Sequence, residues 1–162
     1  MRSSVVRQAS IAFEKFGKPN QVLKLVQSAV PDMPGKGEIT VSIKSNFVSP
    51  EDIRTISGIS LTNTKIGVAG TTGVGVISAI GPVVDDFSVN DMVLVNSQHT
   101  WCDATTVSAC DVIKVPGSMG ITAEEAAALP MMMSAYAVLN NYGNLKSGDA
   151  VALDEKVSLE EL

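Results

Sequence analysis

Residues 38–44, with the sequence EITVSIK, alternate between polar and apolar side chains along their whole length. The three apolar members, Ile39, Val41 and Ile43, fall on one side of this alternation, and the polar members fall on the other. Because successive side chains of a β-strand point to opposite faces, the pattern predicts a half-buried strand. Two prolines and two glycines within residues 31–37 mark the turn that precedes it.

Short apolar runs separated by turn residues lie on both sides of this strand. Turn signals occur at residues 17–20, at Gly81-Pro82 and at Asn90-Asp91, where asparagine tolerates the left-handed backbone of a tight turn. The chain up to Pro116 is therefore predicted to be mainly β. The predicted strands are Ser10–Phe13, Val22–Gln27, Val74–Ile80, Met92–Val95, Thr105–Val107 and Val112–Val115.

Two helices are predicted from the residues at their N-termini. Ser49 is an N-cap candidate with Pro50 at the first helical position, so a short helix is expected to begin there. Thr122 and Glu125 form a capping-box pattern at the start of a helix rich in alanine and methionine. Because proline lacks a backbone donor, we expect this helix to break at Pro130.

One more strand is predicted after the second helix. The apolar run Ala150–Leu153 follows a turn over residues 145–149, and its length and composition are typical of a buried strand. Residues 154–162 are polar.

Composition limits the possible functions of the chain. The 162 residues carry a net charge of −5, with 45% hydrophobic and 18% charged residues, as expected of a folded domain. Nucleic acid is not expected as a partner, because binding its phosphate backbone requires clustered basic residues. The longest apolar stretch, residues 126–139, contains a proline and polar side chains and is too short for a membrane span.

The cysteines and the N-terminus bear on metal binding and location. Cys102 and Cys110 are interpreted as reduced thiols of an intracellular protein. With the single His99 they supply at most three metal ligands, in a spacing that fits no zinc signature, so no metal site is predicted. The first ten residues carry Arg2 and Arg7 but no acid, which fits either a very short mitochondrial presequence or a frayed start of the first strand. Cytoplasmic and mitochondrial locations both stay open.

Several local strings resemble motifs of the medium-chain dehydrogenase/reductase superfamily. The resemblance is to its zinc-free branch, the quinone oxidoreductases and mitochondrial trans-2-enoyl thioester reductases, and it extends over about residues 8–153 in the family's order. The strings are Phe47–Asp52 (the "NPSD" turn), Gly70–Val76 ("G-x-E-G-V-G-V"), Asp86–Val93 ("F-x-V-G-D-x-V"), Thr100–Val107 ("T-W"), Ala126–Tyr136 ("A-A-x-L" with "T-A-Y") and Leu145–Val151 ("L-x-x-G-D-x-V").

The resemblance implies a fold that is mainly β with α. A GroES-like β-barrel is expected over residues 1–120. Residues 121–162 are expected to supply the linking helices and the first strand of a Rossmann domain whose remainder is missing from the chain.

The resemblance also implies site residues. Zinc members bind their metal with a cysteine near Ser49 and a His–Glu pair near Gly70, whereas this chain has Ser49, Thr71 and Thr72 there. Ser60 falls where the enoyl reductases have a proton-donating tyrosine, and a serine would be a poor acid because the pKa of an aliphatic hydroxyl far exceeds that of a phenol. The positions that match substrate-side residues of the family are Ser49, Asp52, Trp101, Ser134 and Tyr136.

Packing is the competing interpretation for three of these residues. Trp101 could anchor a core or loop, and Ser134 and Tyr136 could lie on a buried helix face, as amphipathic helices place such side chains by default.

The family implies NADPH as cofactor, but no residue of this chain is expected to bind its phosphates. The glycines of residues 70–75 are followed by a strand pattern, whereas a dinucleotide loop needs a strand before it and a helix after it. The true loop is expected after residue 153, where the chain has Asp154 and Glu155 and no glycine. Carboxylates at that position would repel a pyrophosphate.

Two functions follow as hypotheses. One is the substrate-side lobe of an NADPH-dependent 2-enoyl thioester reductase or quinone oxidoreductase, not competent as this chain alone. The other is a non-catalytic interaction module derived from that family. Whether the chain is an enzyme stays open. Both hypotheses predict an exposed apolar surface over Ala126–Leu139, covered by a second copy or by a protein partner.

Overall fold

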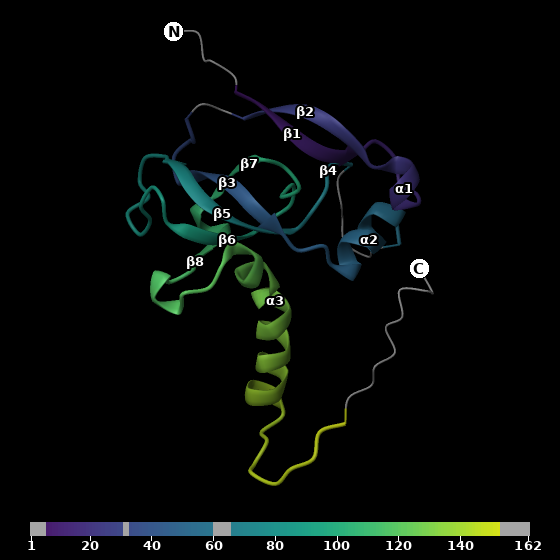
Figure 1. Ribbon diagram of the computed structural model, residues 1–162, viewed down its shortest axis with the longest axis vertical. Coiled ribbons are helices and arrows are strands. Elements are labelled where there is room, and N and C mark those ends of the chain that lie inside the picture. Colours follow the sequence, from purple (N-terminus) through teal and green to yellow (C-terminus); the bar gives the residue numbers. More distant parts are fainter. Residues whose placement is uncertain (1–5, 31–32, 60–65, 153–162) are drawn as a thin grey trace. The chain divides into compact units, whose positions relative to one another are not determined.

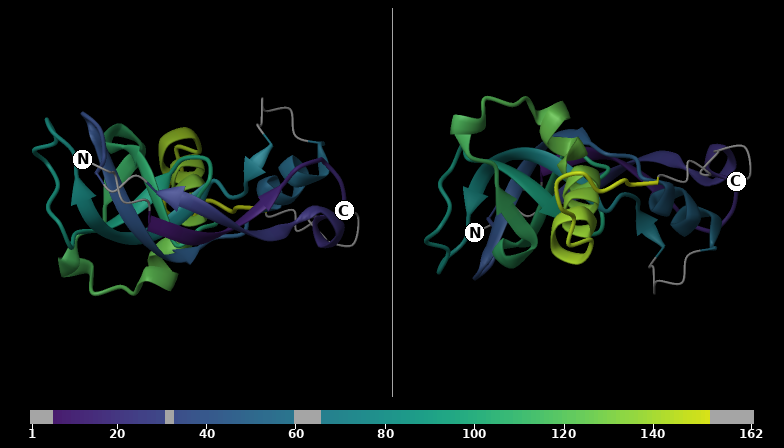
Figure 2. Two further views of the ribbon diagram at one scale, coloured as in Figure 1. Left: turned by 90° about the horizontal axis from the view of Figure 1, so that it is seen from above. Right: turned by 90° about the horizontal axis from the view of Figure 1, so that it is seen from below.

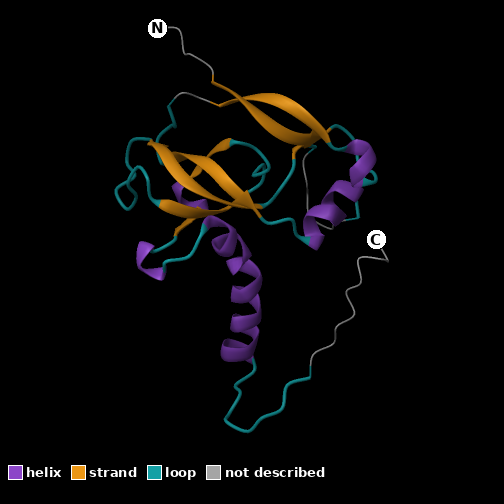
Figure 3. Cartoon of the chain, viewed as in Figure 1, coloured by secondary structure: helices purple, strands orange, loops and turns teal. Residues whose placement is uncertain are grey.

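A computed structural model describes residues 6–30, 33–59 and 66–152 of the chain (Figure 1). The chain divides into two compact units between Leu129 and Pro130. Strands dominate the first unit and form two antiparallel sheets (Figure 3). The expected mainly β fold with α is confirmed.

The larger sheet has five strands in the order β7-β3-β5-β6-β8, and it curls into a half-barrel (Figure 2). The predicted strand of residues 38–44 is β3, which pairs with β5 on one side and β7 on the other. All five strands were predicted to within two residues at either end, and each neighbour pair is antiparallel. The strands are β3 (Glu38–Asn46), β5 (Thr72–Ile80), β6 (Met92–Asn96), β7 (Ala104–Ser108) and β8 (Val112–Lys114).

The core of this sheet consists mostly of aliphatic side chains. Ile39, Val41, Ile77, Val93 and Val95 are fully buried against one another. The polar face of β3 is not simply exposed, since Thr40 is also buried and its hydroxyl lies 3.0 Å from that of Thr106 on β7. The half-buried strand predicted for residues 38–44 is therefore covered on part of both faces.

The smaller sheet has the order β2-β1-β4. It consists of β1 (Val6–Phe13), β2 (Lys24–Val30) and β4 (Gly67–Val68). The strand predicted from Val22 was placed too early, because Pro19–Val22 form the short helix α1 and only then does β2 begin. Proline at the first helical position has the backbone angle that a helix requires.

The helix α2 (Pro50–Ser57) begins as predicted, with Ser49 as its N-cap. It ends at Gly58, whose φ of 77° lies in the left-handed region that glycine adopts without strain. Its buried residue Ile56 joins Phe13, Val22, Ala69 and Trp101 in a second hydrophobic cluster.

The helix α3 (Ala123–Ala137) begins with the predicted capping box. The backbone N–H of Thr122 donates to Glu125 Oε2 at 2.8 Å, and that of Glu125 donates to Thr122 Oγ1 at 3.2 Å. The predicted break at Pro130 is wrong, since the helix continues to Ala137 and then into a π-helical turn, Val138–Tyr142. A proline inside a helix removes one backbone hydrogen bond and crowds the preceding turn, which can kink a helix without ending it. Short 3-10 turns occur at Ala109–Asp111 and Gly117–Met119.

The strand predicted at the end of the chain is not formed by its described part. Ala150–Ala152 are exposed and irregular, and Leu153 lies outside the described residues. A strand of this kind is buried between neighbouring parallel strands, and the described part of the chain offers it no such neighbours. None of the helices in the described ranges is long and apolar enough to cross a membrane.

Candidate functional site

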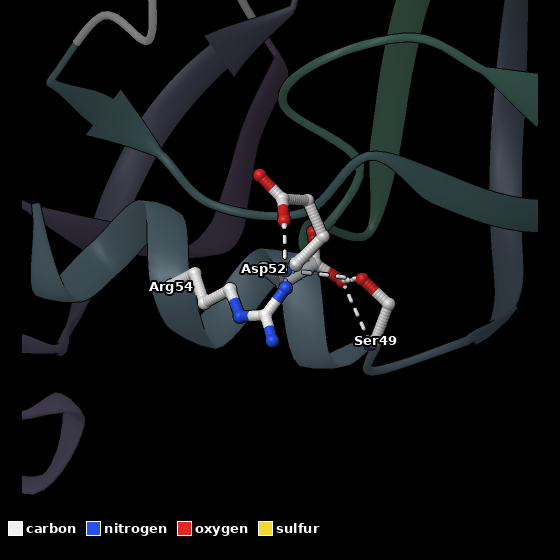
Figure 4. A network of polar contacts seen from close by, with 4 residues as sticks. Ser49, Asp52 and Arg54 are labelled. Atoms are coloured by element: carbon white, nitrogen blue, oxygen red, sulfur yellow. Dashed lines mark hydrogen bonds and ion pairs between the residues drawn. The ribbon is translucent and has the colours of Figure 1, made fainter. Parts of the chain in front are cut away.

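The buried carboxylate of Asp52 is the centre of the candidate site. Asp52 is 2% exposed and lies in the first turn of α2, three residues after the N-cap Ser49 (Figure 4). Its Oδ2 accepts hydrogen bonds from the backbone N–H and the hydroxyl of Ser49, each at 2.8 Å. The Asp52 N–H donates in return to Ser49 Oγ at 3.0 Å. This reciprocal capping fixes the carboxylate relative to the start of the helix.

A second segment of the chain binds the other oxygen of this carboxylate. Thr71, in the loop between β4 and β5, donates its hydroxyl proton to Asp52 Oδ1 at 2.8 Å. The carboxylate thus receives three hydrogen bonds, which compensate for its removal from water. We call Ser49, Asp52 and Thr71 the Asp52 network, and it joins α2 to the β4–β5 loop.

An exposed ion pair lies beside the network but is not part of it. Arg54 Nη1 and Glu51 Oε2 are 3.9 Å apart, and both side chains are about half exposed (Figure 4). Pairs of this kind are screened by water and contribute little to stability.

A pocket of about 170 Å³ adjoins the Asp52 network, and we call it the Asp52 pocket. Its walls combine apolar side chains from the second hydrophobic cluster with polar groups from α2 and two loops. The lining residues are Phe13, Glu51, Asp52, Thr55, Ile56, Val68, Ala69, Gly70, Thr71, Gln98 and His99.

His99 enters this pocket from a strained backbone. Its φ is 72°, a left-handed conformation uncommon for residues other than glycine. Its N–H donates to Gly70 O at 2.9 Å, and its carbonyl accepts from Cys102 Sγ at 3.3 Å. These contacts on both sides hold the chain's single histidine next to Thr71, in a pocket that has room for a small polar group.

The structure brings together only some of the predicted site residues. Ser49 and Asp52 are in direct contact, as described. Trp101 is 8% exposed and belongs to the second hydrophobic cluster rather than to the lining of the Asp52 pocket. Ser134 and Tyr136 are exposed residues of the second unit, and Ser134 Oγ donates to Pro130 O at 3.0 Å. Trp101 is thus packed in a hydrophobic cluster, whereas the predicted buried helix face is wrong for Ser134 and Tyr136.

Ser60, the predicted catalytic position, lies outside the described residues, as do Asp154 and Glu155. Thr71 and His99 were not among the predicted site residues. The one available signal was that Thr71 stands where the zinc members have a metal ligand, near Gly70.

The glycines of residues 70–75 do not form a phosphate loop. Gly73 and Gly75 lie within β5, and a Cβ on Gly75 would come within 2.2 Å of Ser42 O on β3. The glycine therefore permits close packing of two strands, as predicted. None of these glycines precedes a helix N-terminus, which is where a dinucleotide loop binds its pyrophosphate.

Metal-binding residues do not gather in the described ranges either. No three His, Cys, Asp or Glu side chains converge there. The hydroxyls of Ser49 and Thr71 are both engaged with Asp52.

Both cysteines are free thiols, but they differ in their surroundings. Burial and the nearby Asp103 carboxylate raise the pKa of the Cys102 thiol to about 11. Cys102 is therefore protonated near neutral pH and unsuited to act as a nucleophile. Cys110 is exposed.

The second unit presents a row of exposed apolar side chains. The predicted apolar surface does not extend over the whole of Ala126–Leu139, because Ala126 and Ala127 are buried in the first unit against Val74, Leu94 and Val115. The exposed members, which we call the methionine patch, are Met131, Met132, Met133, Tyr136, Val138 and Leu139.

The amino-acid sequence is similar to those of known proteins. Residues 35–140 match the family described as the alcohol dehydrogenase GroES-like domain. The chain is 33% identical over 139 residues to the synaptic vesicle membrane protein VAT-1 homolog of Rattus norvegicus, covering 84% of this chain and 34% of that protein. It is 30% identical over 155 residues to the mitochondrial enoyl-[acyl-carrier-protein] reductase of Dictyostelium discoideum, covering 93% and 43%.

A solved structure shows the same fold. A protein from Bacillus thuringiensis described as an NADPH:quinone reductase superposes with a TM-score of 0.78 at 24% identity, over 89% of this chain and 44% of that one. The chain thus spans less than half the length of each of these three proteins.

Proposed function

Since the chain belongs to the family of the alcohol dehydrogenase GroES-like domain, we propose that it is the substrate-side lobe of an NADPH-dependent oxidoreductase. The reaction type is that of a 2-enoyl thioester reductase or a quinone oxidoreductase. On this proposal the cofactor is bound by a nucleotide-binding domain in addition to this lobe, so the chain alone is not expected to be competent.

The Asp52 network is the observation that carries the proposal. Two of its members, Ser49 and Thr71, stand where the zinc-dependent members place ligands, and both hydroxyls are committed to Asp52. Neutral hydroxyls are weak zinc ligands compared with thiolate and imidazole. The lobe therefore works without metal, and the carboxylate orders the loop and the helix that zinc would otherwise hold together.

The Asp52 pocket is the proposed substrate side of the reaction. Ser49 and Asp52 act as positioning residues. The hydrogen bonds that Asp52 accepts from Ser49 and Thr71 fix one wall of the pocket. Trp101, Ser134 and Tyr136 are retained as substrate-side candidates on the family resemblance. Ser60 occupies the proton-donor position and would be a poor acid there.

The domain organisation follows the same reasoning. Residues 1–120 form the GroES-like lobe, and residues 121–162 lead from it toward a nucleotide-binding domain. NADPH is the cofactor of the complete enzyme, and the residues of this chain do not bind it by themselves. The compartment is intracellular, either cytoplasmic or mitochondrial.

An NADPH titration of the pure chain tests the cofactor claim. The fluorescence of the reduced nicotinamide increases when an enzyme binds it, so a binding site would give a saturating increase. We expect no saturation up to about 1 mM, a concentration far above the micromolar affinity of a complete site. A micromolar dissociation constant would overturn the claim.

A second candidate function rests on the methionine patch. Six apolar side chains between 39% and 67% exposed lie within nine residues of the second unit. Clustered exposed apolar groups mark association sites, and flexible methionines suit adaptable interfaces. The alternative is therefore a non-catalytic module whose patch is covered by a second copy or by a protein partner.

Light scattering of the pure chain tests this alternative. We expect a dimer or larger oligomer that dissociates when Met132 and Tyr136 are replaced by glutamate and serine. A monodisperse monomer at about 100 μM, where a micromolar self-association would be complete, excludes the second copy as the partner.

A further inference from the structure

The first unit carries an open hollow of about 370 Å³, which we call the Asp103 hollow. Strands β1 and β2 form one part of its wall, and residues 101–103 form another. None of the described residues that line it also lines the Asp52 pocket, so it is a separate site that the proposed reaction does not use.

Backbone hydrogen bonds hold this wall in place. Strand β1 pairs with β2 along one edge, with Ile11 opposite Leu25. Along its other edge, the N–H of Ile11 donates to Trp101 O at 2.9 Å. The N–H of Asp103 donates to Ala9 O at 3.1 Å. Because this backbone is already fixed, a ligand would bind without a large cost for ordering the site.

Three aliphatic residues that line the hollow are accessible from outside. Leu25 is 74% exposed, Val48 is 56% exposed and Ile11 is 39% exposed. Side chains directly opposite each other on paired strands are close neighbours, so Ile11 and Leu25 form one apolar surface. Exposed apolar groups that gather at a hollow offer a place where the apolar part of a ligand can be buried.

Asp103 supplies the charge of the hollow. It is an exposed residue, and its Oδ2 accepts from the N–H of Ala9 at 2.9 Å. A carboxylate has about four acceptor positions, so this single bond leaves capacity for a ligand. The described side chains form no ion pair with Asp103. Cys102 is the other ionisable residue among the described ones that line the hollow, and its pKa of about 11 keeps the thiol neutral near pH 7.

We propose that the Asp103 hollow binds a small aliphatic amine in its ammonium form. An ammonium group carries only donors, which suits a carboxylate that can only accept. The alkyl chain of the ligand covers Ile11, Leu25 and Val48. The net charge of −5 on the chain also attracts cations and disfavours anions.

The spacing of the two parts of the hollow sets the length of the ligand. Ala9, beside the Asp103 carboxylate, and Ile11 are two residues apart on one face of β1. Two residues of a strand span about 7 Å, which is roughly the length of a short alkyl chain. An amine with such a chain can therefore reach both the carboxylate and the apolar surface.

Hexylammonium, hexanol and hexanoate provide probes that are alike in chain length and different in charge. Binding is followed by NMR through the backbone amide resonances of Ala9, Ile11 and Asp103. We expect hexylammonium to shift these resonances saturably, with a dissociation constant on the order of 1 mM, the range open to a ligand of this size. Hexanol should bind about threefold more weakly, as the loss of an exposed ion pair implies, and hexanoate should bind more weakly still.

Two substitutions that remove the same charge separate this site from the general field of the protein. Asp103→Asn keeps an oxygen that can accept from Ala9 but removes the charge, so hexylammonium should bind no better than hexanol. Asp111→Asn changes an exposed acid that does not line the hollow, and it should leave hexylammonium binding unchanged.

Leu25→Ser tests the apolar part of the site. Because Leu25 is largely exposed, the substitution should leave the fold intact. It should weaken hexylammonium and hexanol alike, by about threefold, since part of the buried alkyl surface is lost.

Three results would each overturn the proposal. One is equal affinity for hexylammonium and hexanoate, and another is an equal effect of Asp103→Asn and Asp111→Asn. The third is a set of saturable shifts that leaves the amides of Ala9, Ile11 and Asp103 in place. The comparison of the three probes uses the unchanged chain, so it decides the question even if Asp103→Asn does not fold.

Discussion

Replacing Asp52 by alanine should destabilise the first unit strongly. The change removes the acceptor for three hydrogen bonds, two from Ser49 and one from Thr71. Loss of a helix cap costs about 1 kcal/mol. Loss of a hydrogen bond to a charged group costs about 1.5–3 kcal/mol. We therefore expect the free energy of unfolding to fall by about 2.5–4 kcal/mol, with the two contributions taken as separate.

Asp52→Asn is the matched control for this substitution. Its amide oxygen can accept from Ser49, and its amide nitrogen can donate to the Thr71 oxygen, so all three contacts survive without the charge. We expect a loss of about 1 kcal/mol, because charged hydrogen bonds are roughly twice as strong as neutral ones.

Urea unfolding followed by Trp101 fluorescence measures these losses. Trp101 belongs to the first unit and is the only tryptophan, so the signal reports that unit alone. A double-mutant cycle with Thr71→Val isolates the contact between the two side chains, with an expected coupling of about 1 kcal/mol. A loss below about 1 kcal/mol for Asp52→Ala, or additivity within about 0.3 kcal/mol, would refute the reasoning.

Three further predictions concern other parts of the chain. At pH 8 Cys110 should react with a disulfide reagent at least about 100-fold faster than Cys102, since the raised pKa of about 11 leaves Cys102 almost fully protonated. Equal rates in the folded protein would contradict this prediction. Unfolding in guanidinium is the control and should make the two rates equal. Gly75→Ala should lower the free energy of unfolding by more than about 3 kcal/mol, because the new methyl group would overlap the backbone of β3. The control Gly117→Ala has open space around it and should change the free energy of unfolding by less than about 0.5 kcal/mol. Residues 1–149 can be fused to the part of the Dictyostelium relative that this chain does not cover. On the proposed function, the fusion should bind NADPH yet reduce enoyl thioesters slowly, and Ser60→Tyr in it should raise the rate at least about tenfold. An unchanged rate would remove Ser60 from the proton-donor position.

The fold was largely predictable because its signals are local. The alternation in residues 38–44, the Asn90 turn, the N-cap at Ser49 and the capping box at Thr122 each depend on residues only a few positions apart. Asn90 has a φ of 74°, as its place in a tight turn predicted. The predicted helix break at Pro130 was wrong because it rested on the missing backbone donor of one residue and not on the contacts of the helix around it. The strand at Ala150 was misjudged because a buried strand depends on neighbours that the local pattern does not contain.

The site was only partly predictable because its contacts are long-range. Ser49 and Asp52 are three residues apart, and their cap could be recognised from sequence. Thr71 is nineteen residues from Asp52, and only the folded chain reveals that their side chains meet. Trp101 packs in a hydrophobic cluster, one of the two interpretations that the sequence left open, but its unpaired nitrogen has no sequence signal.

The Asp52 network also constrains how this protein can evolve. Its three members come from two separate segments, and removing the polar group of one leaves a buried group of another without a partner. A single substitution that removes such a group therefore passes through a destabilised intermediate, and paired substitutions are favoured. A lineage that exchanged metal ligands for these hydroxyls would face the same barrier in reverse, so reversion to a metal site by single steps is disfavoured.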